Sequence, residues 1–169
     1  RFERLKASGF RSILNLRGAG GAAHYLVEEE SCAKLGLTLV NVTLHARFAA
    51  PRSDIAALLK AFREIERPFV MHCKSGADRA GLMSALYLLI AKKQPARVAM
   101  AQLAWKYGHV KAAKTGLLDA FFAAYIPYED QGMAFFDWVE NVYDPDALAA
   151  NFMAQGWAVR LTDTILRRE

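Results

Sequence analysis

The sequence predicts an α/β fold with a central, mostly parallel sheet of about four to five strands, flanked by helices and followed by a helical C-terminal part. Three observations support this prediction. In the N-terminal half, short apolar runs alternate with longer segments of helical periodicity, which is typical of strands joined by helices. A strand, a tight loop and a helix follow one another over residues 68–91. Beyond residue 91 the segments are mainly helical.

The N-terminal segments form a strand–helix–strand unit. Residues 1–8 are interpreted as the end of a helix, and residues 12–16 as a short strand. A helix is expected over 24–34 and a second strand over 37–44, an order typical of a parallel sheet. The expected helix carries three consecutive acidic residues, which we interpret as a solvated face: Glu28, Glu29 and Glu30.

The middle of the chain repeats this alternation. Ser53 or Asp54 is expected to cap a helix that runs to Ile65, and Pro68 ends it. Residues 68–71 then form a short apolar strand, and residues 82–91 are rich in helix formers.

The C-terminal part is predicted to be helical over 96–107, 116–125 and 135–142. Asp144-Pro145-Asp146 is a strong helix start, and that last helix is expected to end near Gln155-Gly156. A loop at 127–132 would separate the main domain from the C-terminal helices.

Length and composition fit one globular domain with a proper core. The chain has 169 residues, of which 54% are hydrophobic and 23% charged. The net charge of +5 suits anionic substrates, but no Lys/Arg run with interleaved aromatic residues points to nucleic acid. No apolar stretch is long enough to span a bilayer.

The two cysteines, Cys32 and Cys73, make neither a disulfide framework nor a zinc-binding pattern. We therefore predict no metal and a reduced, cytoplasmic setting, with Cys32 as a buried helix residue. The chain starts at Arg1 rather than Met, which leaves room for a missing upstream segment.

The glycine-rich segment 17–23 formally matches a dinucleotide-binding fingerprint after a strand. That fingerprint also needs an acidic residue about twenty positions later, to bind a ribose hydroxyl. The nearest polar residue there is Asn41. We therefore interpret the glycines as a flexible loop and predict no cofactor.

The strongest chemical signal is the stretch from His72 to Gly81, between the expected strand and helix. Backbone N–H groups at a helix start, with the positive end of the helix dipole, favour a bound anion and a thiolate at Cys73. Arg79 adds a fork of donors that matches two oxygens of a phosphate-like group. These features predict a nucleophilic thiolate at the bottom of an anion cradle.

His72-Cys73, followed by five residues and Arg79, resembles the Cys-x5-Arg signature of the cysteine-dependent protein tyrosine and dual-specificity phosphatases. The loop most resembles bacterial atypical dual-specificity members. The resemblance implies a phosphoric monoester hydrolase with a phosphocysteine intermediate, a catalytic domain at 1–126 and a helical extension at 127–169 packed on it. It makes Cys73 and Arg79 catalytic, and the following residues phosphate-binding: Lys74, Ser75, Gly76, Ala77, Asp78 and Arg79.

Two departures from the family pattern bear on mechanism. The residue after the arginine is commonly Ser or Thr, whose hydroxyl helps the thiolate leave, and here it is Ala80. The usual proton donor is an Asp on a separate upstream loop, and residues 43–52 contain no Asp or Glu. The candidate donors are Asp78, which we favour, His45 and Asp54.

Other residues are candidates for accessory roles. His72 is expected to tune Cys73 through hydrogen bonds. The loops at Arg17, at 45–52 and at 73–79 should share one rim, because loops beyond the carboxyl ends of parallel strands gather together. Basic candidates for this rim are Arg47, Arg52, His109, Lys111 and Lys114.

The expected partner is a phosphorylated protein or a small phosphorylated substrate. Lys74 directly after the cysteine also resembles phosphoinositide phosphatases. Two other readings are a phosphate-binding pseudophosphatase and a rhodanese-like sulfurtransferase, which also places a cysteine in an anion-cradling loop.

Overall fold

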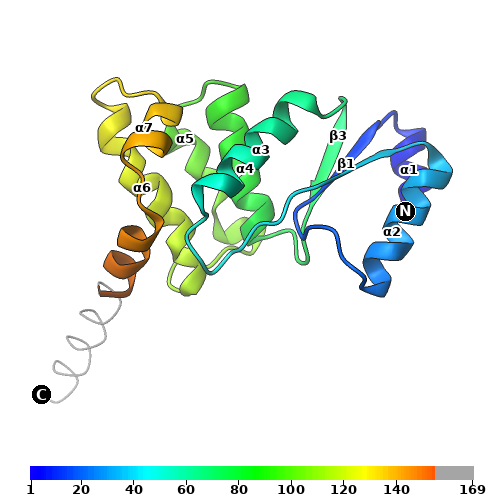
Figure 1. The fold of residues 1–169 in the computed structure, drawn as a ribbon, viewed down its shortest axis with the longest axis horizontal. Helices are drawn as coiled ribbons and strands as arrows, with labels where there is room; N and C mark the ends of the chain where they lie inside the picture. Colours follow the sequence, from blue (N-terminus) through cyan, green and yellow to red (C-terminus); the bar gives the residue numbers. More distant parts are fainter. Residues whose placement is uncertain (155–169) are drawn as a thin grey trace, which may run out of the picture.

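The computed structural model describes residues 1–154, which form a small sheet with helices on both sides (Figure 1). The strands are β1 (Ser12–Asn15), β2 (Thr38–Asn41) and β3 (Phe69–His72). The α-helices are α1 (Phe2–Ala7), α2 (Ala23–Leu35), α3 (Arg52–Glu64), α4 (Asp78–Ala91), α5 (Ala96–Ala99), α6 (Leu117–Glu129) and α7 (Phe135–Asn141). Short 3-10 turns lie at Met100–Gln102, Trp105–Tyr107 and Lys114–Gly116.

The sheet is parallel, with strand order β2-β1-β3. β1 is central and every residue in it is buried, as expected for a parallel strand covered on both faces. The α/β fold and the helical C-terminal part are confirmed. Within residues 1–154 the sheet has three strands, fewer than the four to five expected.

Alternation along β1 divides the core into two clusters. Ile13 faces α1 and α2, where it packs with Cys32 and Leu37. Leu14 belongs to a much larger cluster on the other face, which includes residues of α3, α4, α6 and α7. Figure 1 shows this asymmetry, with α1 and α2 on one side of the sheet and the other helices on the opposite side. Cys32 is a buried helix residue, as predicted.

The helix expected over 96–107 is wrong. α5 ends at Ala99, and the chain continues as two 3-10 turns separated by Leu103 and Ala104 in non-helical conformations. The break places the Leu103 side chain in the main core, where it is 7% exposed. Burial of this leucine outweighs the local helical preference of the segment.

Two helix boundaries also differ from prediction. The cap of α3 is Pro51 and neither Ser53 nor Asp54, and Asp54 lies in the first turn. α6 continues through Pro127 to Glu129, so the predicted loop at 127–132 begins too early. The division into a domain and an extension at residue 126 stays a prediction.

The final helix begins as predicted. Residues 145–154 are helical, and the Asp144 carboxylate accepts hydrogen bonds from the backbone N–H groups of Asp146 and Ala147 at 2.9 and 3.0 Å. Its expected end at Gln155-Gly156 lies outside the described residues. None of the helices in residues 1–154 is long and apolar enough to cross a membrane.

Tyr143 joins this C-terminal part to the loop before α3. Its hydroxyl donates to the Ala50 carbonyl at 2.8 Å, and the Arg52 Nε donates to the Tyr143 carbonyl at 2.8 Å. Tyr143 is 2% exposed within the main core. The end of the loop that follows β2 is therefore fixed to a buried residue almost a hundred positions later in the chain.

Candidate active site

The three strands end at the same edge of the sheet. Asn15 lies in register with Asn41 on one side and His72 on the other. The Asn15 amide donates to the Asn41 side-chain oxygen and to the Gly18 carbonyl, both at 3.0 Å. Asn41 is thus part of the sheet edge, and the loops that follow β2 and β3 leave the sheet beside each other.

The loop after β3 turns tightly around the Cys73 thiol. Gly76 has a left-handed backbone (φ +77°), and its N–H lies 3.2 Å from Cys73 Sγ. Burial alone would raise the pKa of Cys73. The N–H groups of Ala80, Gly76 and Ser75, together with the Arg79 guanidinium, outweigh burial, so the Cys73 pKa is lowered.

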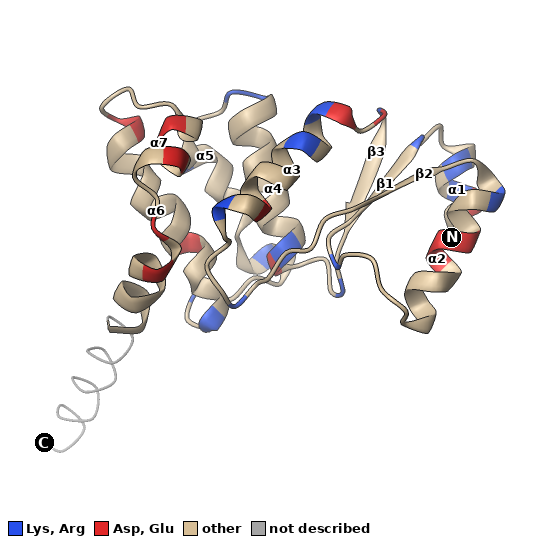
Figure 2. Cartoon of the chain, viewed as in Figure 1, with Lys and Arg blue, Asp and Glu red and all other residues tan. Residues whose placement is uncertain are grey.

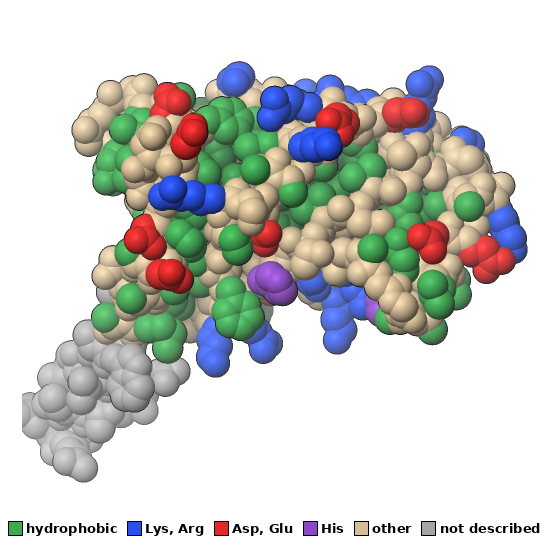
Figure 3. Space-filling view, viewed as in Figure 1, with side chains coloured by type: hydrophobic (Ala, Val, Ile, Leu, Met, Phe, Trp, Pro, Cys, Tyr) green, Lys and Arg blue, Asp and Glu red, His purple; other side chains and the backbone are tan. Residues whose placement is uncertain are grey.

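Cys73 lies in a cleft of about 310 Å³, formed by the loop 73–77, the first turn of α4 and the loop after β2. The structure brings together most of the predicted site residues in its lining: His45, Arg47, Cys73, Lys74, Ser75, Asp78 and Arg79. Lys and Arg positions cluster near the start of α4 and on the neighbouring loops (Figure 2), and basic side chains project around a histidine at the lower edge of the molecule (Figure 3). The cleft therefore presents positive charge around the Cys73 thiol.

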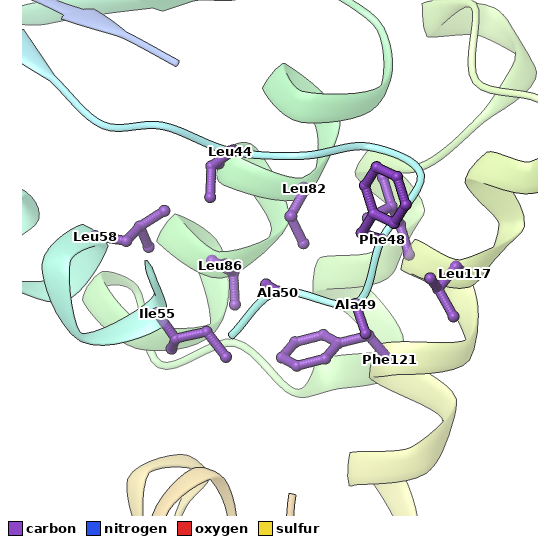
Figure 4. A pocket seen from close by; sticks show the side chains of 11 residues that line it. Leu44, Phe48, Ala49, Ala50, Ile55, Leu58, Leu82, Leu86, Leu117 and Phe121 are labelled. Atoms are coloured by element: carbon purple, nitrogen blue, oxygen red, sulfur yellow. The ribbon is translucent and has the colours of Figure 1, made fainter. Parts of the chain in front are cut away.

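The loop at 44–50 forms the opposite wall of the cleft. Its apolar side chains point toward α3, α4 and α6 and enclose a small cavity of about 10 Å³ (Figure 4). The Phe48 ring is nevertheless 68% exposed and makes an edge contact with the His45 ring, with centroids 5.9 Å apart. The wall thus combines a fixed apolar base with an exposed aromatic rim.

His72 lies behind the loop. Its Nε2 is 2.6 Å from a carboxylate oxygen of Glu28, and its Nδ1 is 3.3 Å from the Cys73 carbonyl. Glu28 is 6% exposed, so the prediction that the acidic run is a solvated face is wrong at this position. The buried carboxylate instead orients the histidine that precedes Cys73.

Asp78 is connected to a second buried pair. His109 Nδ1 lies 2.8 Å from Asp78 Oδ1, and His109 Nε2 lies 2.7 Å from Asp119 Oδ2. The His109 side chain is 1% exposed and that of Asp119 is 8% exposed, whereas Asp78 is 26% exposed and lines the cleft.

Several rim candidates lie elsewhere. His109 is buried, Arg52 donates to the Tyr143 carbonyl, and neither Arg17 nor Asp54 lines the cleft. Lys114 lines an adjacent groove, which shares Arg47 and Phe48 with the cleft and is closed by the helix at 145–154. Arg47 therefore belongs to both surfaces.

Sequence reasoning missed the roles of Glu28, His109 and Asp119. A signal existed for Asp119, which is the single charged residue in an otherwise apolar stretch from Leu117 to Phe122. A lone acid among core residues requires a buried partner. In residues 1–154, no group of three His, Cys, Asp or Glu side chains is arranged to hold a metal ion.

A family model described as the tyrosine phosphatase family matches residues 3–104. No curated protein sequence matches the chain.

Solved structures share the fold at low sequence identity. P. aeruginosa TpbA superposes with a TM-score of 0.55 and 16% identity, over 88% of this chain and 77% of that one. A cysteine-to-serine variant of TpbA in complex with phosphotyrosine superposes with a TM-score of 0.53 and 16% identity, over 88% of this chain and 76% of that one. A putative phosphatase from Shewanella putrefaciens CN-32 superposes with a TM-score of 0.55 and 20% identity, over 73% of this chain and 79% of that one.

Proposed function

Because this chain belongs to the tyrosine phosphatase family, we propose that it hydrolyses phosphate monoesters through a phosphocysteine formed on Cys73. The observation that carries the proposal is the Cys73 thiol, whose pKa is lowered by the surrounding N–H groups and Arg79 against the effect of burial. A thiolate is the reactive form of cysteine, and it lies here in a positively charged cleft.

In the first step, the thiolate attacks phosphorus and the bond to the leaving oxygen breaks. Charge spreads over the equatorial oxygens of the phosphoryl group, where the loop N–H groups and the Arg79 fork stabilise it. In the second step, water attacks the phosphocysteine and releases orthophosphate. The loop from Lys74 to Arg79 has the same task in both steps.

We propose an aryl phosphate such as phosphotyrosine as the preferred substrate. Phosphotyrosine is the ligand in the TpbA variant structure, and the cleft here has an exposed aromatic rim in Phe48. Dual specificity would require that smaller alkyl esters also reach Cys73.

The decisive experiment compares Cys73→Ser with Cys32→Ala as a matched control. We expect Cys73→Ser to abolish hydrolysis of p-nitrophenyl phosphate while vanadate or phosphate binding, measured by calorimetry, is retained. Cys32 lies behind the sheet, so Cys32→Ala should keep the wild-type rate constants. Full activity in Cys73→Ser would refute the mechanism. If the wild-type protein binds phosphate but hydrolyses no ester, a pseudophosphatase is favoured instead.

We further propose Asp78 as the proton donor to the leaving oxygen, since its carboxyl group lines the cleft with Cys73. Asp78→Asn should lower kcat/KM for phenyl phosphate by about a hundredfold, and much less for p-nitrophenyl phosphate, whose leaving group needs little protonation. His45→Gln is the matched comparison, because His45 lines the same cleft. A leaving-group-dependent loss in His45→Gln instead of Asp78→Asn would assign the role to His45.

A further inference from the structure

The buried His109 contacts two carboxylates, and hydrogen-bond counting restricts the protons it shares with them. A neutral imidazole has one N–H and can donate to only one acceptor. Both ring nitrogens lie within 2.8 Å of a carboxylate oxygen, from Asp78 and Asp119. The two contacts together therefore require a second proton, on the ring or on a carboxyl group.

The surroundings place that proton on the ring. Burial alone would lower the pKa of His109, but the hydrogen bonds and charges of Asp119 and Asp78 outweigh it, so the His109 pKa is raised. These two carboxylates are the charged groups that act on the ring, one from each helix packed against it, α4 and α6. An imidazolium satisfies both contacts with two N–H donors.

The cluster connects the core to the cleft through one residue. Asp119 and His109 are almost inaccessible, whereas Asp78 is partly exposed beside Cys73. A change in the charge of the Asp78 carboxyl group therefore acts directly on the buried His109 ring, which it contacts.

We propose that His109 is a positioning residue for the phosphatase reaction, and that its imidazolium orients Asp78 and stabilises the carboxylate that forms when Asp78 gives up its proton. This inference rests on the proposed function. Asp119 is the buried counter-charge that keeps the ring protonated.

Each proton that moves in the two steps of the reaction has a donor and an acceptor. In the form that reacts, Asp78 carries a further proton on Oδ2, the carboxyl oxygen that does not contact His109. As the thiolate forms the P–S bond and the P–O bond breaks, this proton moves to the leaving oxygen, and Asp78 becomes a carboxylate facing the imidazolium. In the second step a water proton returns to Asp78, the remaining hydroxide bonds to phosphorus, and the P–S bond breaks to release the thiolate and orthophosphate. His109 keeps both N–H protons throughout.

The test compares His109→Gln with wild type, using exposed His24→Gln as the control. We expect His109→Gln to lower kcat/KM for phenyl phosphate by about tenfold and for p-nitrophenyl phosphate by less than about twofold. Phosphate binding should not change.

A purely structural role for His109 predicts a different result. Loss of packing would lower activity on both esters equally, and that finding would overturn the inference. If the wild-type protein hydrolyses neither ester, the proposed function fails and this inference with it; equal losses in an active enzyme refute the inference alone.

Ring nitrogen NMR of the folded wild-type protein gives a readout that does not depend on turnover. The His109 signals, identified by their absence in His109→Gln, should be those of an imidazolium at pH 7. Asp119→Asn removes one charge and keeps the shape of the side chain. The His109 ring in this variant should therefore lose its proton at a lower pH than the His109 ring of the wild-type protein. A neutral wild-type ring at pH 6, or an unchanged titration in Asp119→Asn, would contradict the proposal.

Discussion

At the scale of single residues, the two cysteines illustrate how environment decides thiol chemistry. Cys32 lies in an apolar cluster, where burial and then the negative charge of Glu28 raise its pKa to about 11. Cys73 is also largely buried, but N–H groups and a guanidinium surround its sulfur and lower its pKa. Two residues with the same side chain thus differ in chemistry, because burial keeps the Cys32 thiol protonated and the groups around Cys73 favour its thiolate.

Ala80 leads to a prediction at the same scale. Its N–H is among the groups that stabilise the Cys73 thiolate, but its side chain has no hydroxyl to assist departure of sulfur from phosphorus. We expect wild type to show a burst of product followed by slow turnover. Ala80→Thr should raise the steady-state rate by about tenfold, because a hydrogen bond to a charged group contributes roughly 1.5–3 kcal/mol.

The control for that experiment is Ala80→Val, which has the shape of threonine without the hydroxyl. Stopped-flow measurement with p-nitrophenyl phosphate separates the burst amplitude from the steady state. If the Val and Thr variants change equally, the effect is steric and phosphocysteine breakdown does not limit the wild-type enzyme.

At the scale of elements, the segment between α5 and α6 positions the buried histidine. Gly116 allows this segment to turn back on itself, because a Cβ at Gly116 would lie 2.0 Å from the Lys111 carbonyl oxygen. The Thr115 hydroxyl reinforces the turn by donating to the Val110 carbonyl at 3.2 Å. His109 precedes this turn, and Asp119 follows it within the first turn of α6.

Gly116→Ala should therefore destabilise the protein by about 1–3 kcal/mol, since the clash is with backbone and cannot be relieved by a side-chain rotation. Activity on phenyl phosphate should also fall as His109 moves relative to Asp78. Urea denaturation with kinetics on both esters measures the two effects. Gly20→Ala is the control: nothing lies within 4 Å of a Cβ there, and its effect should stay within about 0.5 kcal/mol.

Sequence reasoning succeeded where the signal was local. The strands, α2, α4 and α7 were predicted from short apolar runs and from helix-forming or amphipathic segments. The loop from His72 to Arg79 carries its chemistry within eight consecutive residues. It failed where a distant partner decides. The packing of Leu103 breaks a helix that composition favours. The position and charge of the His109 ring depend on two carboxylates that lie ten and thirty-one positions away in the sequence. Such partners follow from tertiary structure and not from spacing.

At the scale of the whole molecule, the site lies between the two hydrophobic clusters of the core, which differ in size. On one side, α2 packs in the smaller cluster through Cys32 and also carries Glu28, which binds His72. On the other side, α4 and α6 pack in the larger cluster and carry the two carboxylates that contact His109. The loop from Cys73 to Ala77 connects these two sides, so its geometry is supported from both faces of the sheet.

The connection through Tyr143 has a consequence for how substrate preference can diversify. The loop after β2 is fixed at Leu44, which is 3% exposed, and again where Ala50 and Arg52 bind Tyr143. Between these anchors, residues 45–48 line the cleft, whereas the proposed nucleophile and phosphate-binding residues lie on the loop after β3. A new sequence or length in this segment would alter which esters enter the cleft, while Cys73 and the loop around it stay the same.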